Sequence, residues 1–181
     1  MGRIAPEKNV RLLAQIEQEL RKTGRNDFEF VVVGDGIERG WLRENMRNVL
    51  FTGVLTGEDL SRAFANMDVF VFPSETDTFG LVVLEAMASG VPAIVSPGGG
   101  PKYTVQHGKN GFVAHNPAEF SRLIEALLTQ PDLLASFRAA ARESAVSASW
   151  NQVFERMYGT YEGYLRTSAA IGDRVLGAAV T

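Results

Sequence analysis

Two acidic residues on either side of a helix start are the side chains best placed by the sequence to do chemistry. The segment from Pro73 to Pro92 reads PSETDTFGLVVLEAMASGVP, a polar loop followed by an apolar helix whose only charge is Glu85. Asp77 lies just before this helix, and Glu85 lies roughly 9 Å along the axis from a helix start near Phe79, at ~1.5 Å per residue. Because a carboxylate accepts hydrogen bonds from a pair of hydroxyl groups, the two residues suit different ends of a long ligand, such as a sugar and a ribose.

The start of the same helix is a candidate phosphate site. A helix N-terminus carries free N–H groups and the positive end of the helix dipole, and Gly80 lets a ligand approach the backbone. Structural interpretations are open as well. Asp77 or Thr78 could cap the helix, and for Asp77 this is at least as good an account as binding. Glu85 could be a buried charge paired with a lysine or arginine, but here we favour ligand binding.

Two cations near the amino end form a second group of candidates. Arg3 and Lys8 lie in GRIAPEKN, a turn before the first predicted helix, and two cations at such a turn suit a diphosphate. On spacing alone, a solvated loop is the better explanation. The glycines of Gly34-Asp35-Gly36 follow a predicted strand, but Arg39 stands where the dinucleotide-binding fingerprint needs its third glycine, so a tight turn explains them better.

The elements that must position these residues alternate between short apolar strands and helices. We predict strands at 28–33, 49–52, 69–72, 92–96 and 111–114, and helices at 9–23, 37–47, 59–67 and 81–89. Three consecutive helices follow at 117–128, 132–146 and 151–166. The alternation predicts an α/β fold, a Rossmann-like parallel sheet with helices on both faces. Ligands bind such sheets beyond the carboxyl ends of the strands.

The domain organisation is simple. We expect one domain over residues 1–166, followed by a weakly patterned tail at 167–181. The helix from Asn9 has no strand before it, although the alternation requires one. We therefore expect the chain to start within or just after the first strand of its sheet.

Composition narrows the classes of function. The net charge is −3 and no long basic run is present, which argues against bulk nucleic-acid binding. The chain has no cysteine, and no His, Asp and Glu cluster has metal-ligand spacing, so we expect neither a metal nor another cofactor. No apolar run approaches the ~20 residues of a membrane span. We expect a cytoplasmic protein, with peripheral contact at the inner membrane face open for a longer chain.

Taken together, these residues resemble the C-terminal domain of retaining glycosyltransferases with the GT-B fold, in family 4, the group 1 glycosyl transferases. The strongest match is the segment from Pro73 to Pro92, where the family carries a glutamate, seven residues and a second glutamate. In this sequence those two positions are Asp77 and Glu85. Shorter matches follow in the family's order and spacing: GRIAPEKN, VGDG, FTGVLTG and GKNGFV.

The resemblance implies a role for each candidate. Glu85 would bind the ribose hydroxyls of a nucleotide-diphosphate sugar, UDP- or GDP-linked, and Asp77 would face hydroxyls of the donor sugar. Arg3 and Lys8 would neutralise the diphosphate as it leaves. Backbone N–H groups would hold sugar and phosphate at Phe79, Gly80, Leu81 and Val82. The base pocket would be lined by Gly53, Val54 and Leu55.

The resemblance also implies partners. The acceptor, whether lipid, polysaccharide or small molecule, would bind an N-terminal domain that this sequence lacks, so the chain alone should bind nucleotide weakly and catalyse little. Transfer of this kind usually needs no metal. Asp77 is one methylene shorter than the usual glutamate, which could alter the donor preference. The alternatives are a non-catalytic nucleotide or nucleotide-sugar binding module, a Rossmann-like oxidoreductase or epimerase, and a purely structural domain.

Overall fold

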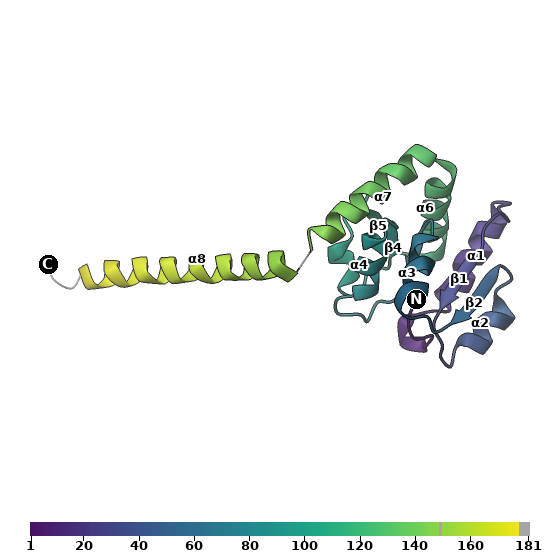
Figure 1. The fold of residues 1–181 in the computed structure, drawn as a ribbon, viewed down its shortest axis with the longest axis horizontal. Coiled ribbons are helices and arrows are strands. Elements are labelled where there is room, and N and C mark those ends of the chain that lie inside the picture. Colours follow the sequence, from purple (N-terminus) through teal and green to yellow (C-terminus); the bar gives the residue numbers. More distant parts are fainter. Residues whose placement is uncertain (149, 178–181) are drawn as a thin grey trace. The chain divides into compact units, whose positions relative to one another are not determined.

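The computed structural model describes residues 1–148 and 150–177 of the chain. The chain divides into two compact units, residues 1–145 and residues 146–181 (Figure 1). All the strands and all the candidate site residues belong to the first unit.

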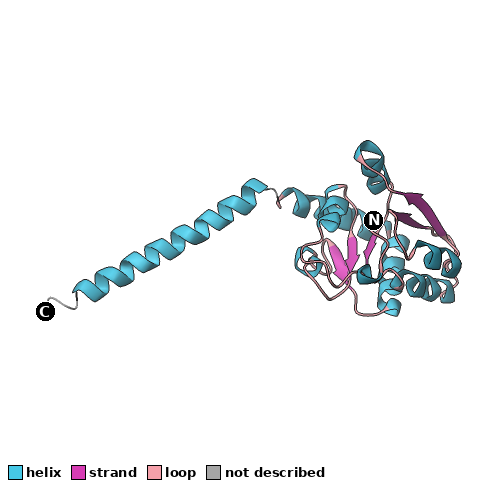
Figure 2. Cartoon of the chain, turned by 90° about the horizontal axis from the view of Figure 1, so that it is seen from below, coloured by secondary structure: helices cyan, strands magenta, loops and turns pink. Residues whose placement is uncertain are grey.

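The strands of the first unit form two parallel sheets. In one sheet β1 (Phe30–Val33) pairs with β2 (Val49–Gly53). In the other, β4 (Ala93–Val95) lies between β3 (Phe70–Phe72) and the edge strand β5 (Gly111–Val113). Figure 2 shows the strands in these two groups. The parallel α/β arrangement predicted from the sequence is confirmed, but the strands form two separate sheets where a single one was expected.

The helices follow the predicted alternation. A short 3-10 helix, η1 (Pro6–Lys8), precedes α1, and the remaining helices of the first unit have these bounds: α1 Leu12–Lys22, α2 Arg39–Asn45, α3 Gly57–Ala65, α4 Leu81–Ala88, α5 Pro101–Thr104, α6 Pro117–Thr129 and α7 Pro131–Val146. The last of them reaches one residue into the second unit. The four-residue α5 was not predicted, because the glycines of 98–100 indicate only a loop.

Helices cover both faces of the three-stranded sheet. On β4, Ile94 packs in a cluster with α1, α6 and α7, whereas Ala93 and Val95 pack in a cluster with α3 and α4. This alternation is the period of two expected of a strand buried on both faces. A third cluster joins Ile4 and α1 to β1 and α2. The sheets are therefore held by apolar packing, and the loops after their strands are left to form a site.

The second unit consists mainly of α8 (Trp150–Gly177). The predicted helix at 151–166 is present, and it continues to Gly177 through residues 167–177 of the weakly patterned tail. The rest of the predicted tail, residues 178–181, lies outside the described residues. Among the helices described, including this long one, none is apolar over enough residues to cross a membrane.

Candidate functional site

A cavity of about 1060 Å³ lies in the first unit and contains the candidate residues. Its walls include the loop after β3, the start of α4, the amino-terminal segment and the loop after β2. The candidates that line it are Arg3, Lys8, Val54, Leu55, Asp77, Phe79, Gly80, Leu81, Val82 and Glu85. Gly53 is the exception: it lies at the end of β2, where its carbonyl accepts a hydrogen bond from the N–H of Gly34. The fold thus brings together side chains that the sequence places far apart.

An ion pair joins two of the candidates directly. Lys8 Nζ donates to Asp77 Oδ1 at 2.7 Å, and the two side chains are 28% and 20% exposed. Partial burial acts to raise the pKa of the Asp77 carboxyl, but the Lys8 ammonium and the nearby Ser74 hydroxyl lower it, and the net pKa lies below its ordinary value. Asp77 is therefore ionised at neutral pH. Its second oxygen, Oδ2, is buried and makes no hydrogen bond of normal geometry within the described residues.

Two further hydrogen bonds tie the loop after β3 to the amino-terminal segment. Thr76 Oγ1 donates to the Glu7 carbonyl at 2.9 Å, and Asn9 Nδ2 donates to the Pro73 carbonyl at 3.3 Å. Asn9 ends η1 in a left-handed conformation with a φ of 51°, which turns the chain from Lys8 into α1. The residues before and after Lys8 are therefore held in place. A lysine whose position is already fixed loses less conformational entropy when it binds an anion.

The loop at 98–100 supports the loop after β3 from the other side. The N–H of Gly100 donates to the Asp77 carbonyl at 2.8 Å. A Cβ on Gly100 would lie 1.9 Å from the Thr78 carbonyl oxygen, so only glycine admits this approach. The backbone of residues 77 and 78 is therefore fixed by contact with a loop about 20 positions later in the chain.

The start of α4 presents free backbone donors to the cavity. The helix begins at Leu81, after Gly80 in a left-handed conformation with a φ of 72°, and its N-terminus has no side-chain cap. Asp77 does not cap it, because its bonded oxygen is held by Lys8, so the capping interpretation is wrong for this residue. Among the described residues, no acceptor is bound by the backbone N–H groups of Phe79, Gly80, Leu81 and Val82. Such a cluster of donors is suited to a phosphate.

Glu85 is not a buried charge, contrary to the structural interpretation of this residue. The buried face of α4 consists of Val83, Ala86 and Met87, and Glu85 is exposed and lines the cavity. It makes no ion pair within the described residues. No salt bridge therefore accounts for its place in the helix, and its carboxylate is free to accept hydrogen bonds from a ligand.

Arg3 is already paired with a neighbour in sequence. Its guanidinium lies 2.8 Å from the Glu7 carboxylate, and the Arg3 side chain is 69% exposed. This pair is solvated and contributes little to stability. Arg3 therefore borders the cavity as an exposed cation, whereas Lys8 is held in place.

The glycines of Gly34-Asp35-Gly36 have a structural role. A Cβ on Gly34 or on Gly36 would lie about 2 Å from the carbonyl oxygen of Gly2 or Ile4. These glycines admit the backbone of residues 2–4 beside β1, a role that the sequence did not indicate. Within the described part of the chain, no group of three or more His, Cys, Asp or Glu residues is placed to hold a metal ion.

Comparisons with known proteins show the family of this chain. Residues 1–130 match the family described as glycosyl transferases group 1. The chain is 39% identical over 182 residues to a GDP-mannose-dependent alpha-mannosyltransferase of Mycolicibacterium smegmatis, covering 99% of this chain and 44% of that protein. It is 34% identical to a protein of the same name from Corynebacterium glutamicum, covering 94% of this chain and 40% of that protein. The chain thus spans less than half the length of these relatives.

A solved structure shares the fold. A mutant of TarM from Staphylococcus aureus, crystallised with fondaparinux, alpha-GlcNAc-glycerol and UDP, superposes with a TM-score of 0.77 at 24% identity, over 87% of this chain and 34% of that chain. The parallel sheets with helices on both sides match GT-B glycosyltransferase structures. By its sequence, the chain belongs to the group 1 glycosyl transferases.

Proposed function

We propose that this chain is the donor-binding part of a retaining glycosyltransferase that takes a sugar from a nucleotide-diphosphate sugar. One observation carries the proposal. A single cavity brings the free N–H groups at the start of α4 together with the Lys8–Asp77 pair and the exposed carboxylate of Glu85. Donors for a phosphate, a cation for a diphosphate and carboxylates for hydroxyl groups are the three kinds of group that such a donor needs.

The chemistry assigned to the protein is stabilisation of the leaving group. In the proposed step, the bond between the sugar's anomeric carbon and the diphosphate oxygen breaks, and an acceptor hydroxyl oxygen forms a bond to the same carbon from the same face. The acceptor proton passes to the leaving diphosphate. Lys8, Arg3 and the N–H groups of α4 bind the negative charge that develops on the diphosphate, which lowers the barrier without any metal.

Asp77 has two successive partners in this proposal. Its carboxylate holds Lys8 near the start of α4 while no diphosphate is bound. A bound diphosphate competes for the Lys8 ammonium, because its two negative charges exceed the single charge of the Asp77 carboxylate. The carboxylate of Asp77 is then released to accept hydrogen bonds from hydroxyl groups of the donor sugar.

The nucleoside is assigned to the other end of the cavity. Glu85 accepts hydrogen bonds from the two ribose hydroxyls, and the apolar side chains of Val54 and Leu55 contact the base. Val54 is 70% exposed at the cavity wall, as a residue that covers a planar ligand would be. We infer guanine as the first base to test, because the two mannosyltransferase relatives are named as GDP-mannose-dependent. TarM was crystallised with UDP, so uridine is the second.

Calorimetric titration of the chain with GDP, UDP, ADP and NADH, followed by GDP-mannose and the matching UDP-sugar, tests the proposal. We expect selective binding of one diphosphate, unaffected by EDTA, with amide NMR shifts at Gly80 and Leu81. Binding of NADH alone would overturn the glycosyltransferase assignment in favour of an oxidoreductase. If the folded chain binds no diphosphate, the same titration is made on a longer chain that includes a preceding acceptor domain, and failure there rejects the proposal.

A transfer assay separates the enzyme from the alternative of a binding module without catalysis. The longer chain is incubated with the donor that binds and with a panel of lipid, polysaccharide and small-molecule acceptors. Release of the nucleoside diphosphate with formation of an α-linked product from an α-linked donor supports a retaining transferase. Tight binding with no transfer to any acceptor, and no slow hydrolysis of the donor, favours the binding module.

A further inference from the structure

Ser74 carries a buried hydroxyl group that lacks a hydrogen-bond partner. The residue is 1% exposed, and its Oγ makes no hydrogen bond of normal geometry within the described residues. It follows Pro73 in the loop that leads from β3 to Asp77. Because burial of an unpaired hydroxyl costs free energy, nearly all buried polar groups in proteins have a partner. The burial of Ser74 in this loop therefore needs an explanation.

A second buried serine already holds the backbone of the same loop. Ser96, which follows β4, is also 1% exposed, and its Oγ donates to the Pro73 carbonyl at 2.9 Å. Asn9 Nδ2 donates to the same carbonyl from the amino-terminal segment. The start of the loop is thus fixed from two sides, and the Ser74 hydroxyl is not needed for that purpose.

The nearest acceptor without a partner belongs to Asp77. Lys8 holds Oδ1 of this carboxylate, whereas Oδ2 is buried and makes no hydrogen bond of normal geometry within the described residues. Burial raises the pKa of the Asp77 carboxyl, and both Lys8 and the Ser74 hydroxyl lower this pKa, so the hydroxyl lies close to the carboxylate. A hydroxyl can donate and an ionised carboxylate can only accept. The loop therefore contains an unused donor and an unused acceptor three positions apart.

Ser74 can act on a ligand only through Asp77. Asp77 lines the cavity, but Ser74 does not, because its side chain is enclosed behind the loop. A direct contact between the Ser74 hydroxyl and a bound nucleotide would require the loop to move. The role open to this hydroxyl is to orient the Asp77 carboxylate.

No second cation is placed to replace Lys8 beside Asp77. Lys8 faces the carboxylate from the amino-terminal segment, where Arg3 also lies, Glu85 is on α4 and Lys102 is on α5. Within the described residues, the pKa of Asp77 responds to the charge of Lys8 and not to the other three charges. If Lys8 moves to a diphosphate, the partly buried carboxylate needs a neutral donor, because an unpaired buried charge is costly.

We propose that Ser74 is a positioning residue that replaces Lys8 as the hydrogen-bond donor to Asp77 when a diphosphate binds. The inference rests on the proposed function, in which the diphosphate draws the Lys8 ammonium away from this carboxylate. The Ser74 hydroxyl then donates to one carboxylate oxygen and holds it in place. The other oxygen is left to accept hydrogen bonds from hydroxyl groups of the donor sugar.

Calorimetric titration of Ser74→Ala with GDP and with UDP tests the replacement, on the longer chain if the short one does not bind. We expect roughly tenfold weaker binding of the preferred diphosphate, because a hydrogen bond to a charged group is lost from the bound state. In an Asp77→Asn background, Ser74→Ala should change nothing, because a neutral amide needs no replacement for Lys8. Equal losses in both backgrounds, or no loss in either, overturn the proposal.

Carbon-13 NMR of the Asp77 carboxyl tests the same hydroxyl without any nucleotide. The signal is assigned by its absence from Asp77→Asn, and Lys8→Met imitates the departure of the lysine. In the Lys8→Met background, Ser74→Ala should raise the pKa of Asp77, and by more than it does beside an intact Lys8. An unchanged pKa overturns the proposal even if diphosphates bind. A raised pKa with no diphosphate binding by any chain supports Ser74 as a donor to Asp77 and places the failure in the proposed function.

Ser96→Ala is the matched control, because it removes an equally buried hydroxyl that already has a partner. It should lower the thermal midpoint and leave the pKa of Asp77 unchanged. Ser74→Ala should do the reverse in the Lys8→Met background, since its hydroxyl makes no hydrogen bond of normal geometry in the free chain. If Ser74→Ala lowers the thermal midpoint as Ser96→Ala does and leaves the pKa of Asp77 unchanged, Ser74 is a structural hydroxyl and the proposal is overturned.

Discussion

Lys8 Nζ lies 2.7 Å from Asp77 Oδ1, although the two residues are 69 positions apart in the chain. This contact joins the amino-terminal segment to the loop before α4 and is the only direct side-chain ion pair among the candidates within the described residues. The pair also neutralises Lys8 until a stronger anion arrives. The lysine assigned to the diphosphate is thus fixed in place by the carboxylate assigned to the sugar, and the two roles can be separated by mutation.

Removal of the Lys8 charge should weaken nucleoside diphosphate binding. In Lys8→Met we expect the affinity for the preferred diphosphate to fall roughly tenfold or more, because a charge-assisted hydrogen bond contributes ~1.5–3 kcal/mol and 1.4 kcal/mol is a factor of ten. Asp77→Asn should leave this affinity unchanged or raise it, because it releases Lys8. Calorimetry checks both variants.

The matched control is Lys22→Met, which removes a lysine that pairs with Glu19 on α1 and does not line the cavity. It should bind as the parent chain does. Equal losses in Lys8→Met and Lys22→Met would show that the effect is one of net charge, and a large loss in Asp77→Asn would mean that the diphosphate needs the intact pair.

Glu85 and Asp77 should affect different parts of the donor. Glu85→Ala should lower the affinity for the nucleoside diphosphate by roughly 10- to 100-fold, since two ribose hydroxyls lose a charged acceptor. Asp77→Ala should not lower it, because Lys8 is released, and its effect should appear as a smaller gain in affinity when the sugar is added to the diphosphate. Titrations with the diphosphate and with the sugar nucleotide, on each variant, measure both quantities.

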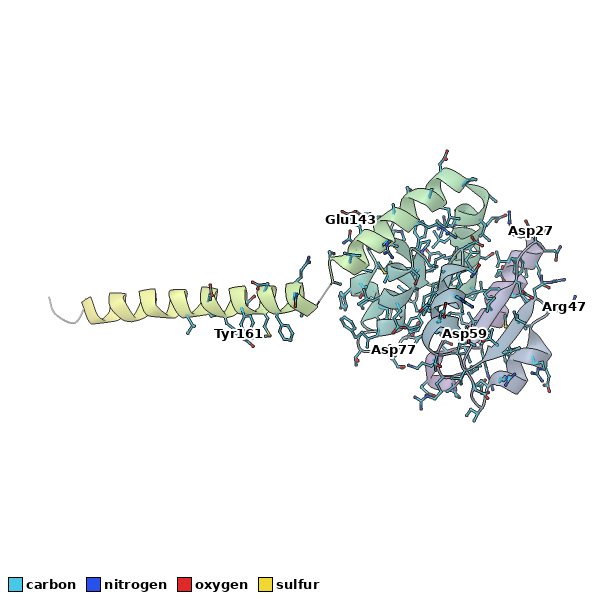
Figure 3. All side chains as sticks on the ribbon, viewed as in Figure 1. Asp27, Arg47, Asp59, Asp77, Glu143 and Tyr161 are labelled. Carbon is cyan, nitrogen blue, oxygen red and sulfur yellow. The ribbon has the colours of Figure 1, made fainter. Side chains whose placement is uncertain are left out.

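Glu143→Ala serves as the control, because Glu143 is an exposed helical glutamate on α7 and does not line the cavity (Figure 3). It should match the parent chain in both titrations. Equal and negligible losses in Glu85→Ala and Asp77→Ala, with circular dichroism showing an intact fold, would reject the assignment of both residues.

The sequence was sufficient to predict the strands and the longer helices, although not the short η1 and α5. Each strand of the structure falls within a predicted strand or extends it by one residue, and α4 begins at Leu81 as predicted. The local signals are strong here, because continuous apolar runs mark buried parallel strands and glycines mark the turns after them. The pairing of the strands was not predictable in the same way, since a ladder depends on which strand lies beside which, and the split into two sheets has no local signal.

The exposure of Glu85 could have been predicted from the helical period, although the overall composition of the helix does not indicate it. The helix is rich in apolar residues, which left a buried, paired charge open as an alternative to ligand binding. At 100° per residue, however, Val83, Ala86 and Met87 share one face, and Glu85, two positions after Val83, falls about 200° away from it. Leu81 is 60% exposed on the same helix. The helical period could therefore have placed Glu85 on the cavity side, whereas the Lys8–Asp77 contact could not be found without the fold.

The close approach of Gly100 to the loop before α4 predicts a selective loss of both stability and binding. In Gly100→Ala the new Cβ would lie 1.9 Å from the Thr78 carbonyl oxygen, so one of the two loops must move. We expect the free energy of unfolding to fall by roughly 1–3 kcal/mol, as at other overpacked sites. We also expect the affinity for the diphosphate to fall, because the N–H donors at the start of α4 shift. Urea unfolding and calorimetry measure the two effects.

Gly159→Ala is the matched control for this variant. Gly159 lies inside α8, and a Cβ added to it would have no neighbour within 4 Å, so alanine should be neutral or should stabilise the helix by up to about 1 kcal/mol. Diphosphate binding should not change. If Gly100→Ala unfolds and binds like the Gly159→Ala chain, the loop at 98–100 does not position the start of α4.

Burial of the Met1 amine predicts a pH dependence of stability between pH 6 and pH 8. Burial lowers the pKa of this group from 8.0 to about 6, so in this window the unfolded chain binds a proton that the folded chain does not. The free energy of unfolding therefore rises with pH. The loss of stability that comes from burying a protonated amine is complete below pH 6 and absent above pH 8. At 1.36 kcal/mol for each pH unit, it is on the order of 2–3 kcal/mol. Urea unfolding of the free chain and of an N-terminally acetylated chain, both checked by intact mass for retention of Met1, isolates the contribution of the Met1 amine. The acetylated chain should be more stable near pH 5 and equally stable near pH 9, and a difference that is the same at both pH values would show that the amine is solvated in the folded chain.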